Sequence, residues 1–96
     1  MHVLGLDLHL RLRHVQSLKE KRSAIRPILD RLPKLGVSVS EVGDHDDHQS
    51  ARVGVAVVSG SPRQATEIID EAERIVWSRA DIEVVSADRT WMEIDR

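Results

Sequence analysis

The sequence predicts one α+β domain whose elements follow the order strand, helix, strand, strand, helix, strand. Two observations predict this order. Apolar and polar residues alternate in the strand segments, and two longer segments repeat apolar residues at helical spacing. A chain of 96 residues has room for a single hydrophobic core. We therefore expect one domain over residues 1–96, without a linker.

The first strand is predicted at residues 4–12, where every even position is leucine. The odd positions between these leucines carry glycine or a polar residue: Gly5, Asp7, His9 and Arg11. A period of two is typical of a strand with one buried face and one solvated face.

The first helix is predicted to begin at Ser17, because Ser17 and Glu20 form a capping-box pattern ahead of an apolar stripe. Pro27 lies inside the stripe and predicts a kink, since proline lacks a donor and crowds the preceding turn. Pro33 is expected to loosen the last turn. Gly36 then predicts the helix end.

The middle of the chain predicts two strands joined by a polar loop. Residues 37–42 alternate and end at Gly43, and the loop covers residues 44–50. Residues 53–58 are apolar on both faces, which favours a central strand.

The second helix is predicted from a serine cap at Ser61 to Asp81, and the last strand from residue 82 to 94. A change of parity predicts a bulge near residues 86–88. With right-handed crossovers, these elements predict a ferredoxin-like βαββαβ sandwich. Its four-stranded antiparallel sheet carries two helices on one face.

Composition excludes several classes of chemistry. The chain has no cysteine, so it forms no disulfide and no thiolate metal site. Its longest apolar run, residues 53–58, is too short for a membrane helix, and its first residues do not resemble a signal peptide. No nucleophile elbow, Walker loop or dinucleotide fingerprint is present. We expect a cytoplasmic protein without a cofactor, and the sequence does not settle whether it is an enzyme.

Basic residues concentrate in the first third of the chain. Residues 1–36 contain eight Lys/Arg against three Asp/Glu, and residues 37–96 contain six against thirteen. Five basic residues are candidates for holding the phosphates of RNA: Arg11, Arg13, Lys19, Arg22 and Arg26. The alternative is an ordinary solvated helix face. Lys21 lies within the apolar stripe, where its stem can pack while its amine reaches water.

The loop after Gly43 offers a weak candidate for a metal site, because it contains His45, Asp46 and His48. A solvated turn is the simpler interpretation. Asp7 lies on the polar face of the first strand and could serve a metal-dependent nuclease. The sequence places no second carboxylate beside it.

Two tryptophans are candidates for self-association, since exposed tryptophans often mark interfaces. Trp77 falls outside the stripe of the second helix, and Trp91 lies on the irregular last strand. They favour a homodimer. The alternative is that Trp91 folds back over its own core.

Three blocks carry a resemblance to a known family: Ser17-Leu18-Lys19-Glu20-Lys21-Arg22, Ser38-Val39-Ser40-Glu41-Val42-Gly43-Asp44 and Gly54-Val55-Ala56-Val57-Val58-Ser59. As a set, with the length and element order, they resemble the bacterial YlxP-like family (DUF503). The resemblance implies a ferredoxin-like fold in a cytoplasmic protein, often encoded among translation and ribosome-maturation genes. It supplies no activity and no catalytic residues. Family members commonly carry a leucine-aromatic pair where this chain has His45-Asp46-Asp47-His48.

Three functions remain open from the sequence. The first is a non-catalytic binding protein associated with RNA or the ribosome. The second is a metal-dependent phosphodiesterase that uses Asp7. The third is a regulatory dimer that binds a small ligand.

Overall fold

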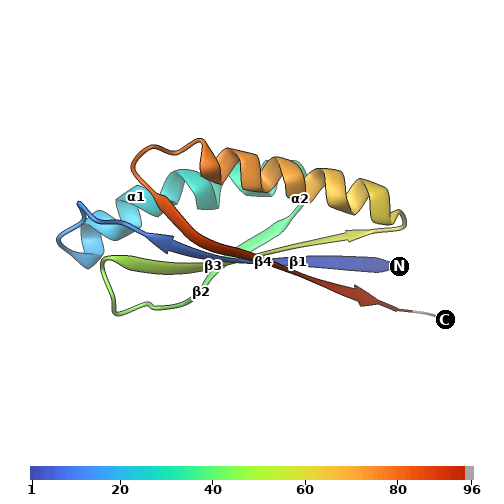
Figure 1. Cartoon of the computed structure of the whole chain (residues 1–96), viewed down its shortest axis with the longest axis horizontal. Helices are drawn as coiled ribbons and strands as arrows, with labels where there is room; N and C mark the ends of the chain where they lie inside the picture. The colour runs from blue at the N-terminus through green and yellow to red at the C-terminus, as the bar shows by residue number, and fades with distance from the viewer. Residues whose placement is uncertain (95–96) are drawn as a thin grey trace.

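Four strands form one antiparallel sheet in the computed structural model, which describes residues 1–94. The spatial order is β2-β3-β1-β4. The strands are β1 (His2–Arg11), β2 (Ser38–Gly43), β3 (Ser50–Ser59) and β4 (Glu83–Glu93). Helices α1 (Leu18–Arg31) and α2 (Pro62–Trp77) cover one face of this sheet (Figure 1). The predicted ferredoxin-like βαββαβ sandwich is confirmed.

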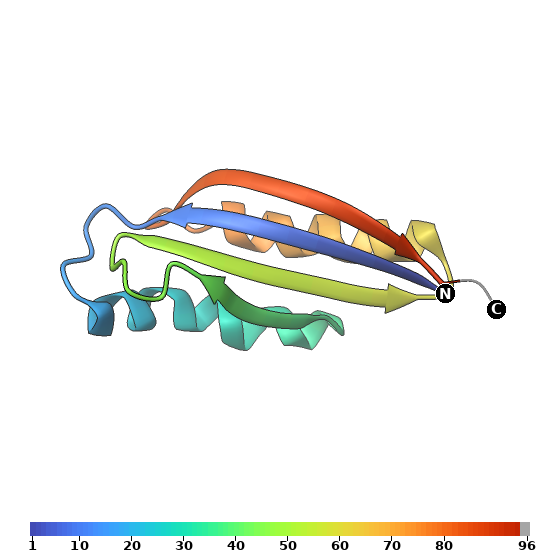
Figure 2. The same cartoon turned by 90° about the horizontal axis from the view of Figure 1, so that it is seen from below.

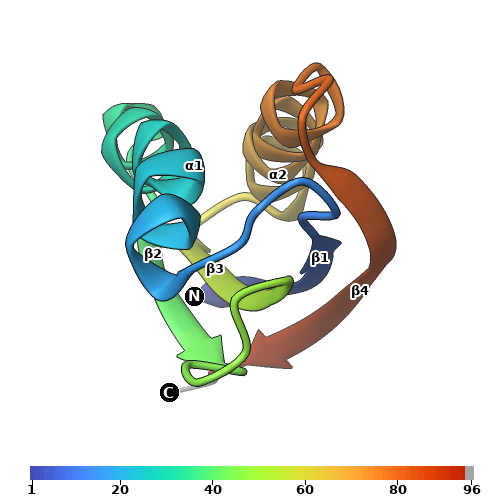
Figure 3. The same ribbon diagram turned by 90° about the vertical axis from the view of Figure 1, so that its left-hand side faces the viewer.

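The core lies between the helices and the sheet. The leucines of β1 are all buried, and they are joined there by alternate residues of β3 and by the inner faces of both helices. The other face of the sheet, called the open face below, carries no helix (Figure 2). Viewed along the strands, the two helices lie side by side above a twisted sheet (Figure 3). Among the described residues, no helix is long and apolar enough to cross a membrane.

Both predicted serine caps are present. The Glu20 backbone N–H donates to Ser17 Oγ at 3.1 Å, and the Gln64 N–H donates to Ser61 Oγ at 3.2 Å. The Glu20 carboxylate accepts from the backbone N–H of Gln16 at 2.8 Å, one residue before the amide expected in a capping box. Each helix therefore begins where its sequence predicts.

The ends of the elements differ in detail from the predictions. The α-helix continues through Pro27 to Arg31, and a 3-10 turn, η1 (Leu32–Leu35), follows it and ends at Gly36 with φ 84°. The second helix ends at Trp77 instead of Asp81. There the N–H of Arg79 bonds to the Val76 carbonyl, which begins a chain of tight turns.

The predicted irregularity of the last strand is a β-bulge at Val85, just before the expected segment. His9 pairs with Ser86, whereas Leu10 pairs with Val84, so one extra residue separates the two pairs. The bulge restores the parity that places Val84 against the core. The central position predicted for β3 is correct. Its Val58 nevertheless remains 62% exposed, because the open face is uncovered.

Candidate nucleic-acid interface

The outer face of α1 brings together three of the five predicted phosphate-binding residues. Lys19, Arg22 and Arg26 are exposed and line a shallow groove of about 430 Å³. Their spacing of three and four residues places them in one row along the helix. The row lies along one flank of α1, where Arg22 and Arg26 also line a second hollow with Asp30 and with Glu41 of β2, and its cations are exposed to a partner.

The basic residues outside α1 and η1 are engaged with carboxylates. Every arginine of that kind within residues 1–94 forms an ion pair: Arg11, Arg13, Arg52, Arg63, Arg74, Arg79 and Arg89. The lysines and arginines without an ion pair to any residue of the described chain all lie on α1 and η1: Lys19, Arg22, Arg26, Arg31 and Lys34. We call these five residues the basic cluster.

Two of the predicted phosphate-binding residues belong to a different surface. Arg11 and Arg13 both approach the carboxylate of Glu83, at 3.6 Å and 3.3 Å, where β1 meets the start of β4. Their charge is therefore partly neutralised inside the chain. The sequence could not show this, because Glu83 is 70 residues away from Arg13.

Neighbouring carboxylates also raise the pKa values of two arginines, Arg74 on α2 and Arg89 beside it on β4. The hydrogen bond and charge of Glu71 raise the pKa of Arg74. Burial alone would lower the pKa of Arg89, but hydrogen bonds and charges from Asp70 and Glu73 raise it. Arg89 therefore links β4 to α2, at 2.8 Å from Asp70 and 3.0 Å from Glu73.

The Lys21 side chain is fully buried and forms a clamp that the sequence did not predict. Its ammonium donates to the backbone carbonyls of Asp44 and Asp47, at 2.6 Å and 2.8 Å, and lies 2.9 Å from Glu41 Oε2. The expectation that the amine reaches water is wrong, since the side chain is 2% exposed. The clamp fixes the loop between β2 and β3 to the inner side of α1.

The loop of the metal hypothesis forms a tight turn under this clamp. The Asp47 N–H donates to the Asp44 carbonyl, and Asp47 Oδ1 accepts from the Gln49 N–H. Asp44 has φ 59°, a left-handed conformation that aspartate tolerates. His45 and Asp46 are exposed and His48 is half-buried. Across residues 1–94, no three His, Asp or Glu side chains gather in a way that could hold a metal ion.

Asp7 has a neighbouring carboxylate that the sequence did not show. Asp7 is paired with Asp88 across β1 and β4, so both side chains lie on the open face. Arg52 on β3 lies 3.4 Å from Asp7 Oδ2. Asp88 forms no ion pair within the described residues. Two carboxylates and one guanidinium therefore lie close together on the open face.

The two tryptophans are exposed but lie far apart. Trp77 is the last residue of α2, near the start of β4, whereas Trp91 lies near the end of β4. The end of α2 and the end of β4 lie at different points along the long axis of the molecule (Figure 1). The two indoles therefore do not form one surface.

Comparisons with known proteins agree with the geometry. The family model described as "Protein of unknown function (DUF503)" matches residues 3–89. The chain is 36% identical over 76 residues to the uncharacterized protein YlxP of Bacillus subtilis (strain 168), covering 78% of this chain and 83% of that protein. A de novo designed protein with a ferredoxin fold superposes with a TM-score of 0.54 at 13% identity, covering 96% of this chain and 84% of the design. The family resemblance and the fold are both confirmed.

Proposed function

We propose that this chain, which belongs to the DUF503 family of proteins of unknown function, is a non-catalytic protein that binds RNA phosphates through α1. The observation that carries this proposal is the basic cluster. Cations that neighbouring carboxylates leave unpaired can neutralise phosphates and release the counterions of RNA. The arginines elsewhere in residues 1–94 are already paired.

The size of the cluster suits a nucleic-acid backbone. Lys19 and Lys34 are 15 residues apart along α1 and η1, or roughly 24 Å at about 1.5 Å per residue in the α-helix and about 2.0 Å in the 3-10 turn. Only Glu20 and Asp30 add exposed negative charge along this length, and Glu20 is engaged at the helix cap. Lys19, Arg22 and Arg26 therefore present a row of positive charge that can follow several phosphates, whereas Arg31 lies on the side of the helix that faces α2.

The proposed recognition reads phosphates and not bases. Base recognition by a ferredoxin-like sheet relies on aromatic side chains on the central strands. Here the open-face positions of β1 and β3 include Asp7, His9, Gly54, Ala56 and Val58. An RNA on this surface would also meet Asp88. We therefore place the RNA on α1, with little sequence preference.

The proposal implies a cytoplasmic protein in contact with RNA or ribosomal particles. Support comes from the basic cluster, and from the genomic association of the YlxP-like family that the sequence resemblance implies. A homodimer would double the number of basic clusters and strengthen binding to a long RNA.

Charge reversal of Arg22 and Arg26 tests the proposal. We expect the double variant R22E R26E to lower RNA affinity at least tenfold, and to reduce the slope of log affinity against log salt by about two. A labelled RNA hairpin titrated by fluorescence polarisation, from about 50 to 200 mM salt, measures both quantities.

The matched control is R63E R74E, which makes the same change of net charge on exposed residues of α2. We expect this control to keep most of the affinity and most of the slope. Equal losses in both variants would show a non-specific effect of net charge. Unchanged binding in R22E R26E would remove α1 from the RNA site.

The cross-strand pair of Asp7 and Asp88 favours a second candidate, a metal-dependent phosphodiesterase. Two neighbouring carboxylates can share a divalent ion, and such ions activate water for attack on phosphodiesters. Incubation of labelled RNA with Mg²⁺, Mn²⁺ or Zn²⁺ tests it. Cleavage that is lost in D7N and in D88N supports the enzyme. Cleavage that persists in both variants, or none with any of the three metals, rejects it.

A further inference from the structure

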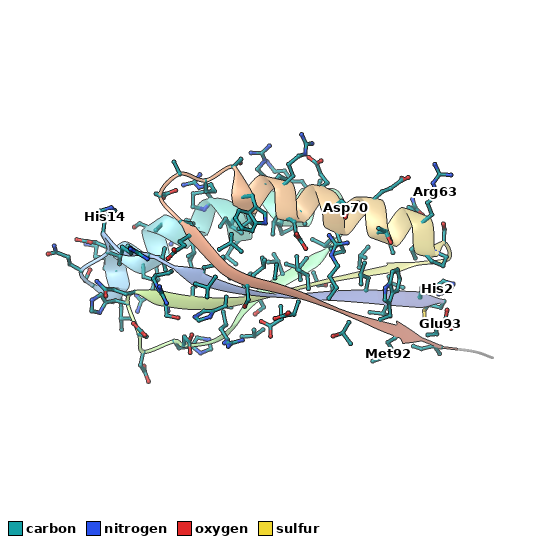
Figure 4. All side chains as sticks on the ribbon, in the orientation of Figure 1. His2, His14, Arg63, Asp70, Met92 and Glu93 are labelled. Carbon is teal, nitrogen blue, oxygen red and sulfur yellow. The ribbon has the colours of Figure 1, made fainter. Side chains whose placement is uncertain are left out.

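The open face carries an apolar patch at one end. The register places Val58 and Met92 on either side of Val3, and the Ile94 N–H donates to the Met1 carbonyl at 3.0 Å. Val58, Met92 and Met1 are 62%, 59% and 57% exposed. Figure 4 shows Met92 on the side of the sheet away from the helices. A cluster of exposed large apolar side chains is typical of a binding surface.

The middle of the open face is hollow. Its floor is formed by Gly5, Gly54 and Ala56 on the central strands, its sides by β2 and β4, and its lining includes Asp7 and Asp88. The hollow has a volume of about 420 Å³. The small residues at the centre leave room for side chains of a second surface to enter the hollow, next to the larger apolar residues at the end.

We propose that a second copy of this chain packs on the open face, with the two-fold axis parallel to the strands. This orientation places the apolar end of one copy on the apolar end of the other. An axis perpendicular to the strands in the same plane would instead place Val58 and Met92 over the polar end of the face, near His9 and Arg52. Asp7 and Arg52 carry opposite charges on this face, so two copies can be complementary there, and Asp88 adds a second carboxylate.

The open face approaches the size of a standard dimer interface. Strands β1, β3 and β4 contribute ten or eleven residues each to this face and β2 contributes six, at about 4.8 Å between strands and about 3.3 Å per residue. The face's projected area of about 600 Å², increased by side-chain relief, approaches the roughly 800 Å² per partner of a standard interface.

The dimer is independent of RNA binding. The helices lie on the opposite side of the sheet from the proposed interface, so both basic clusters stay exposed (Figure 1). It also differs from association through the tryptophans, because Trp77 lies at the end of α2, in the helix layer.

Sedimentation equilibrium of the full chain over a range of concentrations tests the proposal. We expect the wild type to dimerise and V58E to raise the dimer dissociation constant at least 100-fold. The matched control is W77E, since Trp77 is 60% exposed and Val58 is 62% exposed. We expect W77E to dimerise like the wild type. A wild type that remains monomeric, or dissociation by W77E and not by V58E, overturns the proposal.

A crosslinking experiment keeps the test decisive where V58E perturbs folding. The chain contains no cysteine, so a single introduced thiol reports one position. We expect Val58→Cys to form covalent dimers with a short bismaleimide. The control Arg63→Cys, on a 90% exposed side chain of α2, should remain monomeric. Equal crosslinking at both positions would indicate random collision and overturn the interface.

Discussion

Lys21 shows how one residue can decide the position of a loop. Its ammonium is removed from water and satisfied by two carbonyls and the carboxylate of Glu41. A buried charge is tolerated only when its partners are close and complete. Removal of the amine would leave the Glu41 charge and two carbonyl oxygens without their donor. The cost of that loss exceeds the cost of losing an exposed lysine.

We predict that Lys21→Met lowers the free energy of unfolding by about 3 kcal/mol and the Tm by at least about 10 °C. Lys19→Met, an exposed neighbour on the same helix, should change stability by less than about 0.5 kcal/mol. Thermal and urea unfolding measure both. Glu41→Gln in the Lys21→Met background should recover part of the loss, because it removes the uncompensated carboxylate. Similar losses for the two lysine variants would contradict the clamp.

The sequence predicted the position of Lys21 but not its role. Helical spacing placed it in the apolar stripe, and that placement is correct. Its acceptors are main-chain carbonyls 23 and 26 residues further along the chain. No pattern of side chains indicates a contact with the backbone of a distant loop. For a similar reason, the sequence did not indicate that Arg11 and Arg13 pair with the distant Glu83.

At the scale of elements, α1 tolerates a proline in its interior. Pro27 is exposed and supplies no N–H to the carbonyl one turn earlier, at Ser23. The inner face of the helix, with Ile25 and Ile28, is buried against the core and offsets this loss. Local sequence predicted each helix start correctly, because caps depend on neighbouring residues. It placed the end of α2 too late, because the tight turns that follow Trp77 depend on backbone hydrogen bonds.

We predict that Pro27→Ala raises the free energy of unfolding by about 1 kcal/mol, which corresponds to a rise in Tm of about 4–8 °C. Alanine restores one helical hydrogen bond, and the gain is reduced by the greater freedom of the unfolded chain. Pro62→Ala is the control, because Pro62 lies in the first turn of α2, where no helical bond is lost. Chemical denaturation of the two variants measures the difference, and a destabilised Pro27→Ala would contradict it.

At the scale of the whole molecule, one face of the sheet forms the core with the helices and the other face remains open. Alternation along β1 predicted which side chains form the core, and the buried leucines confirm it. The pairing of Asp7 with Asp88 depends on the register between β1 and β4, which the bulge at Val85 sets. The sequence therefore predicted the fold and three members of the basic cluster. Predicting which residues share the open face would also require the strand order and the register, which the sequence does not give.

The Lys21 clamp also affects which substitutions the loop between β2 and β3 can tolerate. Because its ammonium binds main-chain oxygens of Asp44 and Asp47, the path of the loop does not depend on the side chains between them. His45 and Asp46 project into solvent from a turn that is already held. Substitutions at these two positions should therefore be nearly neutral for folding. A domain built in this way can acquire a new loop surface, such as the His-Asp sequence of this chain, while its scaffold stays the same.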